Sequence, residues 1–192
     1  MKQVKLVDVT DEIVKQLWES GRSDHRWPEP SGSETGFAAF VEEWQAAAVM
    51  GLGKMMAVRT QISGPTEEQI RGFVTFHVLD PMWSTADYVV VECGTYLLPP
   101  IRGQGWNRAV KAASLSHAAV QFGADAVVYV VPEDNLPAIR SLERMVGEYR
   151  VSSMPAKATA SELENILKRW LSYRAWKEGK PFRLFVIPLE SA

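Results

Sequence analysis

The residues best suited to chemistry lie in LLPPIRGQGWN at positions 97–107, where the pattern predicts a turn between a strand and a helix. Gly103 and Gly105 would let the backbone approach a ligand closely, because glycine carries no side chain. The N–H groups at the start of the following helix have no partner within the helix and favour an anion. The segment therefore predicts a phosphate site, and an ordinary tight connection is the alternative.

This turn does not match either common phosphate-binding sequence. The pattern GxxxxGK[ST] is absent from the chain. Gly103 and Gly105 are followed by Arg108 at the position where a GxGxxG dinucleotide fingerprint has its third glycine. A nucleoside triphosphate or dinucleotide site of the usual kind is therefore not indicated.

The surrounding elements follow from hydrophobic periodicity and from capping residues. Thr10 and Ser33 are each placed to cap a helix, and Gly123 to end one. We expect strands at 4–9, 54–62, 70–79, 88–98, 126–131, 149–153 and 182–188, and helices at 11–18, 33–50, 106–122, 136–145 and 161–178. This order predicts a single α/β (α+β) domain, residues 1–192, built around one sheet.

Composition excludes several classes of protein. The 192 residues are 46% hydrophobic and 23% charged, which is typical of a globular chain rather than a disordered one. A net charge of −2 gives no electrostatic case for binding nucleic acid or an anionic membrane. Cys93 is the single cysteine, and the three histidines lack metal-ligand spacing, so we expect no disulfide and no metal. Without a signal peptide or a long apolar run, a cytoplasmic location is expected.

The segment LLPPIRGQGWNRAVKAA resembles the acyl-CoA-binding motif of the GNAT acetyltransferase superfamily. The matching positions are Leu97, Pro99, Arg102, Gly103 and Gly105. The stricter form of the motif has Gln or Arg where this chain has Pro100. The resemblance implies the GNAT acyl-CoA N-acyltransferase fold, a mixed and mostly antiparallel sheet flanked by helices, here with an extra helix before the last strand.

A second segment, PEDNLPAIRSLERM, resembles the next conserved block of that superfamily. Asn135 and Ala138 match its Asn-x-x-Ala pattern, and Glu143 matches an acidic position that often follows. The likeness is clearest for about residues 70–147. Leu142 stands where many members have a tyrosine that protonates the leaving thiolate, and Tyr149 is the nearest later tyrosine.

The resemblance implies acetyl-CoA as the acyl donor and an amine as the acceptor. The pantetheine arm would bond to main-chain groups near Leu97 and Leu98, with Asn135 and Ala138 on the opposite wall. The pyrophosphate would lie on the amides of Arg102, Gly103, Gln104, Gly105, Trp106 and Asn107, at the helix N-terminus. The acceptor amine would attack the thioester directly, without a covalent enzyme intermediate.

That reaction needs a group to take the proton of the acceptor ammonium. Glu92 lies on the long strand, where the superfamily often has such a carboxylate, and it can equally be a surface residue. His77 on the preceding strand is the second candidate, with a structural role in the sheet as its alternative. Cys93 is expected to be a buried free thiol.

Acceptor specificity in this superfamily usually comes from the loop after the first helix and from the last connection. The loop carries Asp24, His25, Trp27 and Glu29, which suit an amine, although Trp27 can equally be a packing anchor. The helix at 161–178 could cover the acceptor or form a homodimer contact.

Small amines, lysines and protein N-termini remain open as acceptors. A non-catalytic coenzyme-binding or interaction module and a transferase for longer acyl chains are the rival functions.

Overall fold

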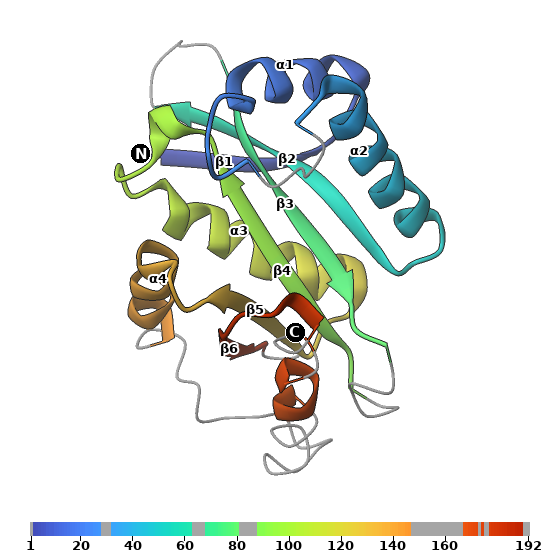
Figure 1. The fold of residues 1–192 in the computed structure, drawn as a ribbon, viewed down its shortest axis with the longest axis vertical. Coiled ribbons are helices and arrows are strands. Elements are labelled where there is room, and N and C mark those ends of the chain that lie inside the picture. Colours follow the sequence, from blue (N-terminus) through green and yellow to red (C-terminus); the bar gives the residue numbers. More distant parts are fainter. Residues whose placement is uncertain are drawn as a thin grey trace. The chain divides into compact units, whose positions relative to one another are not determined.

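The computed structural model describes residues 2–27, 32–62, 68–80, 88–146, 167–172, 174 and 177–189. Figure 1 shows the arrangement of its helices and strands. In chain order these are β1 (Lys2–Asp8), α1 (Asp11–Gly21), α2 (Glu34–Val49), β2 (Gly53–Ile62), β3 (Gln69–Val78), β4 (Val90–Leu97), the 3-10 helix η2 (Pro99–Ile101), α3 (Trp106–Phe122), β5 (Ala126–Pro132), α4 (Leu136–Val146) and β6 (Phe182–Pro188).

The strands form one six-stranded sheet in the order β1-β2-β3-β4-β5-β6. The outer pairs β1/β2 and β5/β6 are antiparallel, whereas β4 and β5 are parallel. This mixed, mostly antiparallel sheet flanked by helices confirms the predicted fold class. The bounds of α3 agree with the expected helix at 106–122, and those of β6 with the expected strand at 182–188.

The expected strand at 149–153 and the first part of the expected helix at 161–178 lie outside the described residues. Residues 167–172, 174, 177 and 178 are helical, as predicted. Leu167 and Trp170 in that segment are buried. The part of the predicted extra helix that can be described therefore has the periodic apolar face that the sequence indicated.

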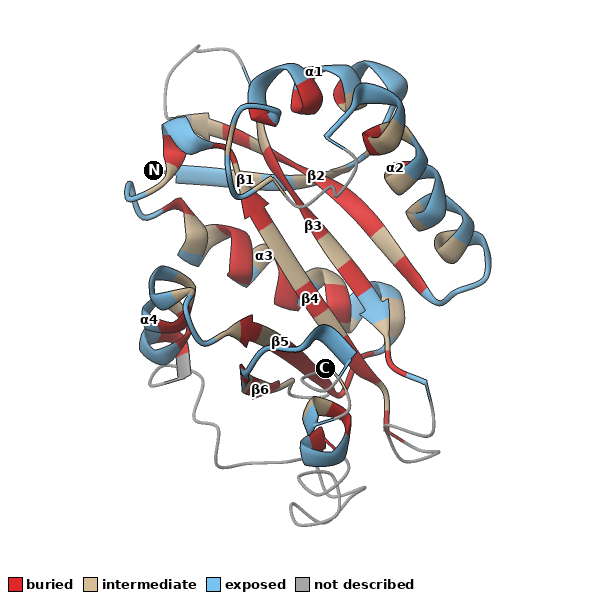
Figure 2. Ribbon diagram, in the orientation of Figure 1, coloured by how far each residue is buried: buried red, intermediate tan, exposed pale blue. Residues whose placement is uncertain are grey.

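The chain divides into two compact units, and a single domain over residues 1–192 stays a prediction. The first unit comprises residues 1–76 and 94–114. Its helices begin at the predicted caps, since the Thr10 side chain accepts from the Ile13 amide and Ser33 from the Gly36 amide. In Figure 2 buried residues line one side of α1, and its other side is exposed.

The core of this first unit is rich in aromatic rings. Phe37 of α2 and Phe73 of β3 are buried beside Tyr96 of β4. Trp27, from the loop after α1, meets Phe37 with ring centroids 4.6 Å apart and Tyr96 at 5.1 Å. Aromatic pairs at such distances stabilise beyond the area they bury. The loop after α1 is thereby attached to the strand that leads to the glycine turn.

The second unit comprises residues 77–93 and 115–192. Its central strand β5 is buried on both faces, as its uninterrupted apolar sequence predicted. Asp125, just before β5, fixes the start of the strand. Its carboxylate accepts from the Val89 amide at 2.9 Å, and its own amide donates to the Val89 carbonyl at 2.9 Å. β5 pairs along its whole length with β6.

Candidate functional site

The predicted phosphate turn connects η2 to α3. Gly103 and Gly105 have φ angles of 73° and 77°, in the left-handed region that side-chain-bearing residues rarely adopt. A Cβ atom built on Gly103 would meet nothing within 4 Å. Glycine is therefore needed at Gly103 for the backbone conformation and not for lack of space within the protein. The turn leads directly into Trp106, the first residue of the 17-residue helix α3.

A lysine from the first strand lies beside this turn, and the sequence analysis did not anticipate it. The Nζ of Lys2 donates to the carbonyl oxygen of Gln104 and lies 5.3 Å from the centroid of the Trp106 ring. The Gln104 side chain donates to the carbonyl of Pro100 at 2.6 Å. A positive charge therefore stands next to the glycines. No sequence pattern marks Lys2, because it is separated from the turn by about a hundred residues.

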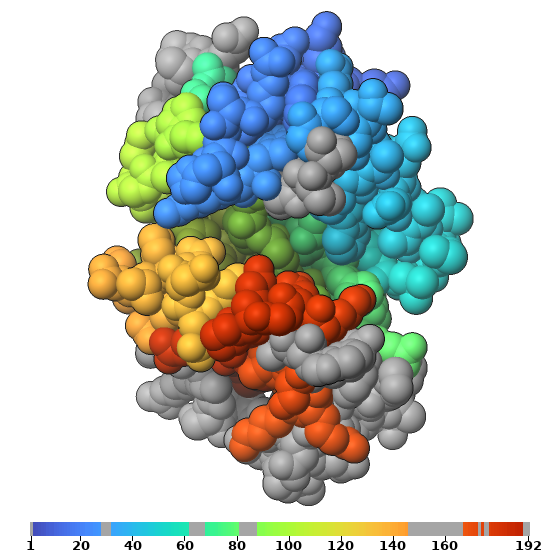
Figure 3. Space-filling view, viewed as in Figure 1, coloured from blue at the N-terminus to red at the C-terminus, as the bar shows by residue number. Residues whose placement is uncertain are grey.

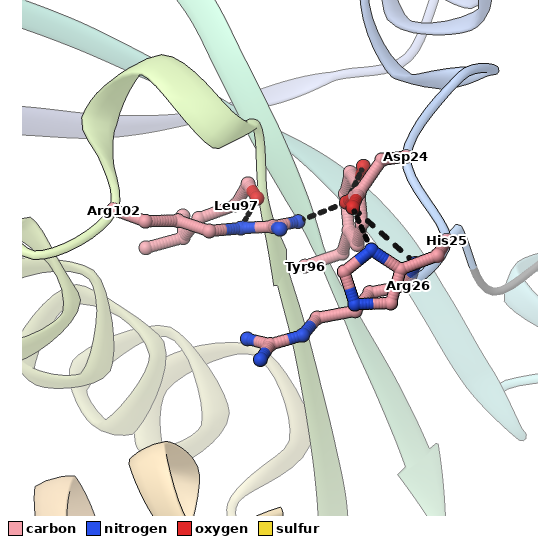
Figure 4. A network of polar contacts seen from close by, with 6 residues as sticks. All are labelled: Asp24, His25, Arg26, Tyr96, Leu97 and Arg102. Carbon is pink, nitrogen blue, oxygen red and sulfur yellow. Dashed lines mark hydrogen bonds and ion pairs between the residues drawn. The ribbon is translucent and has the colours of Figure 1, made fainter.

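The arginine of the motif is held against its own unit (Figure 4). The Nε of Arg102 donates to the carbonyl oxygen of Leu97 at 2.7 Å, and its Nη2 forms an ion pair with Asp24. The guanidinium carbon lies 5.2 Å from the centroid of the Tyr96 ring. Protein groups therefore contact both parts of the Arg102 guanidinium: its edge through hydrogen bonds and its flat face through an aromatic ring.

Asp24 comes from the loop after α1, and only 4% of its side chain is exposed. Besides Arg102, it accepts from the Tyr96 hydroxyl at 2.8 Å and from the Arg26 amide at 3.3 Å. The hydrogen bond from Arg102 is the main reason why the pKa of Asp24 falls to about 2. Burial, followed by the hydrogen bond to Asp24, raises the pKa of Tyr96 well above its usual value.

The last residues of β4 have distinct backbone roles. The Leu98 amide donates to the carbonyl of Arg71 at 2.8 Å, which pairs it with β3. Since neighbouring residues of a strand direct their amides and carbonyls to opposite edges, those of Leu97 point away from β3. The parallel register of β4 with β5 ends at Glu92↔Val128, whereas β4 continues to Leu97.

The second predicted block forms the start of α4. The carboxamide oxygen of Asn135 accepts from the Ala138 amide at 3.4 Å, and the Asn135 carbonyl accepts from the same amide at 3.1 Å. The two matching residues are therefore brought together, with Asn135 capping the helix. The carboxamide oxygen of Asn135 is thus used within the helix start.

The two catalytic candidates lie together in the second unit. Nδ1 of His77 is 3.9 Å from Oε2 of Glu92. The other carboxylate oxygen of Glu92 forms an ion pair with Arg174. The His77 side chain is 52% exposed and that of Glu92 only 17%, so the imidazole is the more accessible of the two. No sequence pattern marks the contact of Arg174 with Glu92, because the two residues are 82 positions apart.

Leu142, at the position expected for a catalytic acid, is buried, and so are the tyrosines Tyr88 and Tyr96. Leu142 is 1% exposed and packs in the interior of its unit. Tyr88 is 2% exposed, and burial followed by the charge of Asp125 raises its pKa to about 12. Tyr96 donates its hydroxyl to Asp24. Cys93 is buried and forms no disulfide, as predicted. Tyr149 lies outside the described residues.

Among the residues that the structure describes, no helix is long and apolar enough to cross a membrane. The same residues contain no group of three or more His, Cys, Asp or Glu side chains arranged to hold a metal ion.

Comparison with known proteins identifies a related family. The model of the acetyltransferase (GNAT) family matches residues 18–147. No curated protein matches the sequence. Among solved structures, a spermidine N-acetyltransferase from Vibrio cholerae in complex with CoA and spermine is similar, with 13% identity, coverage of 74% of this chain and 79% of that one, and a TM-score of 0.57.

A second similar structure is a ribosomal-protein alpha-N-acetyltransferase in complex with coenzyme A. It is 18% identical, the alignment covers 73% of this chain and 77% of that chain, and the TM-score is 0.58. At this level of identity these likenesses show a shared fold, which agrees with the element order found here.

Proposed function

Since the chain belongs to the acetyltransferase (GNAT) family, we propose that it is an acetyl-CoA-dependent N-acetyltransferase. The observation that carries the proposal is the glycine turn ahead of α3, with two left-handed glycines and the Lys2 ammonium beside them. Such a turn offers backbone N–H groups and positive charge to the same ligand. Both properties suit the phosphates of coenzyme A.

We propose that the pyrophosphate lies on the amides of residues 102–107 at the start of α3. Gly103 contributes its backbone conformation and the absence of a side chain, so that a phosphate oxygen can approach. Lys2 supplies the neighbouring cation, because Arg102 is already paired with Asp24. Lys2 extends the predicted set of coenzyme residues.

The pantetheine arm would follow the edge of β4 that faces away from β3. Leu97 directs its amide and carbonyl to that edge, and its carbonyl oxygen can accept a second hydrogen bond besides that from Arg102. Leu98 stays a predicted contact of the arm, and its amide already donates to the carbonyl of Arg71. Asn135 and Ala138, which lie together at the start of α4 in the second unit, stay predicted contacts of the arm.

The reaction begins when a base removes a proton from the acceptor ammonium. His77 is assigned this role because its imidazole is exposed, and Glu92 stabilises the imidazolium that forms. The amine nitrogen then bonds to the thioester carbonyl carbon and releases its second proton to water, the C–S bond breaks and the thiolate leaves. Because Leu142 has no proton to donate, water protonates the thiolate. The amide and free coenzyme A are the products.

One observation favours a second candidate function. Glu92 is held by Arg174, and Leu142 occupies the position expected for an acid. A chain with both features could bind the coenzyme without transferring its acetyl group. In that case it would act as a coenzyme-binding or interaction module.

The acceptor is proposed as an amine, with small amines, lysines and protein N-termini all retained. The similar structures include a spermidine N-acetyltransferase in complex with spermine and an alpha-N-acetyltransferase of a ribosomal protein. Screening should therefore include a polyamine, a lysine peptide and a peptide with a free N-terminus. Acetyl-CoA should be compared with longer acyl donors in the same assay.

The test has two stages. Thermal unfolding is first measured with acetyl-CoA, coenzyme A and NAD. A ligand present at 100 times its dissociation constant adds roughly 2.7 kcal/mol to the stability of the native state. A rise in Tm with both acetyl-CoA and coenzyme A, but not with NAD, supports the proposed coenzyme site. Release of thiol with an amine then supports transfer, whereas binding without release in the screen supports the module. No rise at millimolar ligand overturns the proposal.

A further inference from the structure

The guanidinium of Arg102 joins three separate parts of the first unit. Its Nη2 reaches Asp24 in the loop after α1, and its Nε reaches the carbonyl of Leu97 at the end of β4. Arg102 itself belongs to the glycine turn. Figure 3 shows the loop after α1, in blue, lying against the yellow-green turn at the surface of this unit.

The loop that carries Asp24 is itself well fixed. The Asp24 amide donates to the Gly21 carbonyl at 2.8 Å, and the Trp27 amide donates to the Asp24 carbonyl at 2.9 Å. The Trp27 ring packs so closely on Gly21 that a Cβ atom there would lie 2.0 Å from it. A carboxylate held in such a loop can define the position of its partner.

We propose that Asp24 and Arg102 act as a positioning pair for the coenzyme site, and that the guanidinium of Arg102 does not bind phosphate. Asp24 holds the guanidinium against the Leu97 carbonyl, so that the end of β4 and the glycine turn keep a fixed spacing. The coenzyme would contact both of these segments. The inference rests on the proposed function, since it concerns the site assigned there to pantetheine and pyrophosphate.

Three observations support this reading. The Asp24 carboxylate neutralises the charge of Arg102, which a phosphate would otherwise use. The planar fork of arginine can serve Asp24 and Leu97 at once, whereas the single ammonium of a lysine on a flexible stem is a point charge. Since the pKa of Asp24 is about 2, the carboxylate stays ionised at every pH at which an acetyltransferase would work.

The test compares coenzyme A binding by isothermal calorimetry in the full chain and in three variants. Arg102→Lys retains a positive charge but loses the Nε donor to Leu97. Asp24→Asn retains the size of the side chain but not its charge. The third variant combines Asp24→Asn with Arg102→Lys. Tyr96→Phe is the matched control, because it removes the other side-chain donor to Asp24 and leaves Arg102 in place.

A positioning pair predicts that each single variant raises the Kd for coenzyme A by about tenfold. The double variant should match either single variant and not reach a hundredfold, because the two residues act through one another. Tyr96→Phe should stay within about threefold. In steady state, the KM for acetyl-CoA should rise while kcat at saturation stays within twofold, which a general loss of stability would not produce.

The opposite results separate the two proposals. If wild-type protein binds coenzyme A and Arg102→Lys binds it equally well, Arg102 contributes only charge and the positioning role is wrong. The positioning role would also be wrong if the increases in Kd from the two substitutions multiplied in the double variant. If Asp24→Asn does not fold, the Kd of Arg102→Lys for coenzyme A alone tests the positioning role. Failure of the wild-type protein to bind coenzyme A would instead overturn the proposed function.

Discussion

Arg174 and Glu92 form an ion pair that connects the helical segment before β6 to strand β4 within the second unit. Arg174 also donates through Nε to Glu178 at 2.7 Å, and its guanidinium carbon lies 5.7 Å from the Phe182 ring centroid. Burial lowers the pKa of Arg174, but the charges of Glu92 and Glu178 and the hydrogen bonds to them together outweigh this effect and raise it. The carboxylate of Glu92 is therefore fixed beside His77 and is not a freely rotating surface group.

The fixed carboxylate predicts a kinetic effect of Glu92→Gln. This substitution keeps a hydrogen-bond acceptor for Arg174 but removes the charge that would stabilise an imidazolium on His77. We expect kcat/KM for the amine to fall by about 100-fold, in the range usual for acid–base groups. Initial rates of thiol release at neutral pH measure the effect.

Glu178→Gln is the control for that experiment, because it removes the same charge from the other partner of Arg174. Its rate should stay within threefold of wild type. Equal rates for Glu92→Gln and the wild-type protein would show that Glu92 has no part in proton transfer and would strengthen the case for a coenzyme-binding module.

The glycine turn predicts a selective loss of coenzyme binding in Gly103→Ala. The φ of Gly103 is 73°, and alanine in the left-handed region costs about 1 kcal/mol. Gly51 has a φ of 72° and equally open surroundings, so Gly51→Ala carries the same backbone cost far along the chain from the turn. Both variants should lose similar stability in urea denaturation.

Only Gly103→Ala should also weaken coenzyme A binding, by at least tenfold, because its methyl group would stand where a phosphate oxygen approaches. Calorimetric titration of both variants gives the comparison. An unchanged Kd in Gly103→Ala would mean that the turn does not contact the coenzyme.

Local patterns were sufficient to predict most elements. The helix-capping signals at Thr10, Ser33 and Gly123 depend only on neighbouring residues, and the helices of the structure begin or end at these positions. The buried strand β5 was visible as an apolar run between two helical patterns. The glycine turn was visible because two glycines and a helix start occur within a few residues. Each of these features is encoded over a short stretch of chain.

The partners of the site residues could not be predicted in this way. Lys2 reaches Gln104 across 102 positions, and Arg174 reaches Glu92 across 82. Asp24 reaches Arg102 across 78 positions, although its loop suggested contact with an acceptor. Such pairs depend on how strands and loops pack, and a single sequence carries no signal for them. The charges around the site therefore had to come from the structure.

The position of Lys2 predicts an electrostatic contribution to coenzyme binding. Lys2→Gln removes the cation next to the turn, so the Kd for coenzyme A should rise about fivefold, as expected for a charge-assisted contact near the surface. The remaining affinity should also depend less on salt, because one screened attraction is lost. Titrations at 50 and 300 mM salt measure both effects.

Lys5→Gln is the matched control, since Lys5 lies on the same strand but pairs with Glu68 at 2.8 Å. Lys5→Gln changes the net charge of the protein as much as Lys2→Gln does, and it should leave the Kd for coenzyme A within twofold of wild type. Equal weakening by both substitutions would point to a long-range effect of net charge and not to a contact made by Lys2.

The buried carboxylate of Asp24 predicts a pH-dependent part of stability. Its pKa falls from 3.8 to about 2 on folding, chiefly through the hydrogen bond from Arg102. A carboxyl group whose pKa is lower in the folded state binds fewer protons there. It therefore stabilises the fold at pH values above 3.8, and this contribution disappears as the pH falls toward 2. The shift corresponds to about 2 kcal/mol.

Asp24→Asn removes this titration. Urea denaturation at steps from pH 6 to pH 2.5 should show wild type more stable than Asp24→Asn by about 2 kcal/mol at pH 6. The difference should shrink below pH 4, as the wild-type carboxylate takes up its proton in the unfolded chain first. A difference that stays constant down to pH 2.5 would mean that Asp24 contributes through packing, and that its ion pair with Arg102 adds no stability of its own.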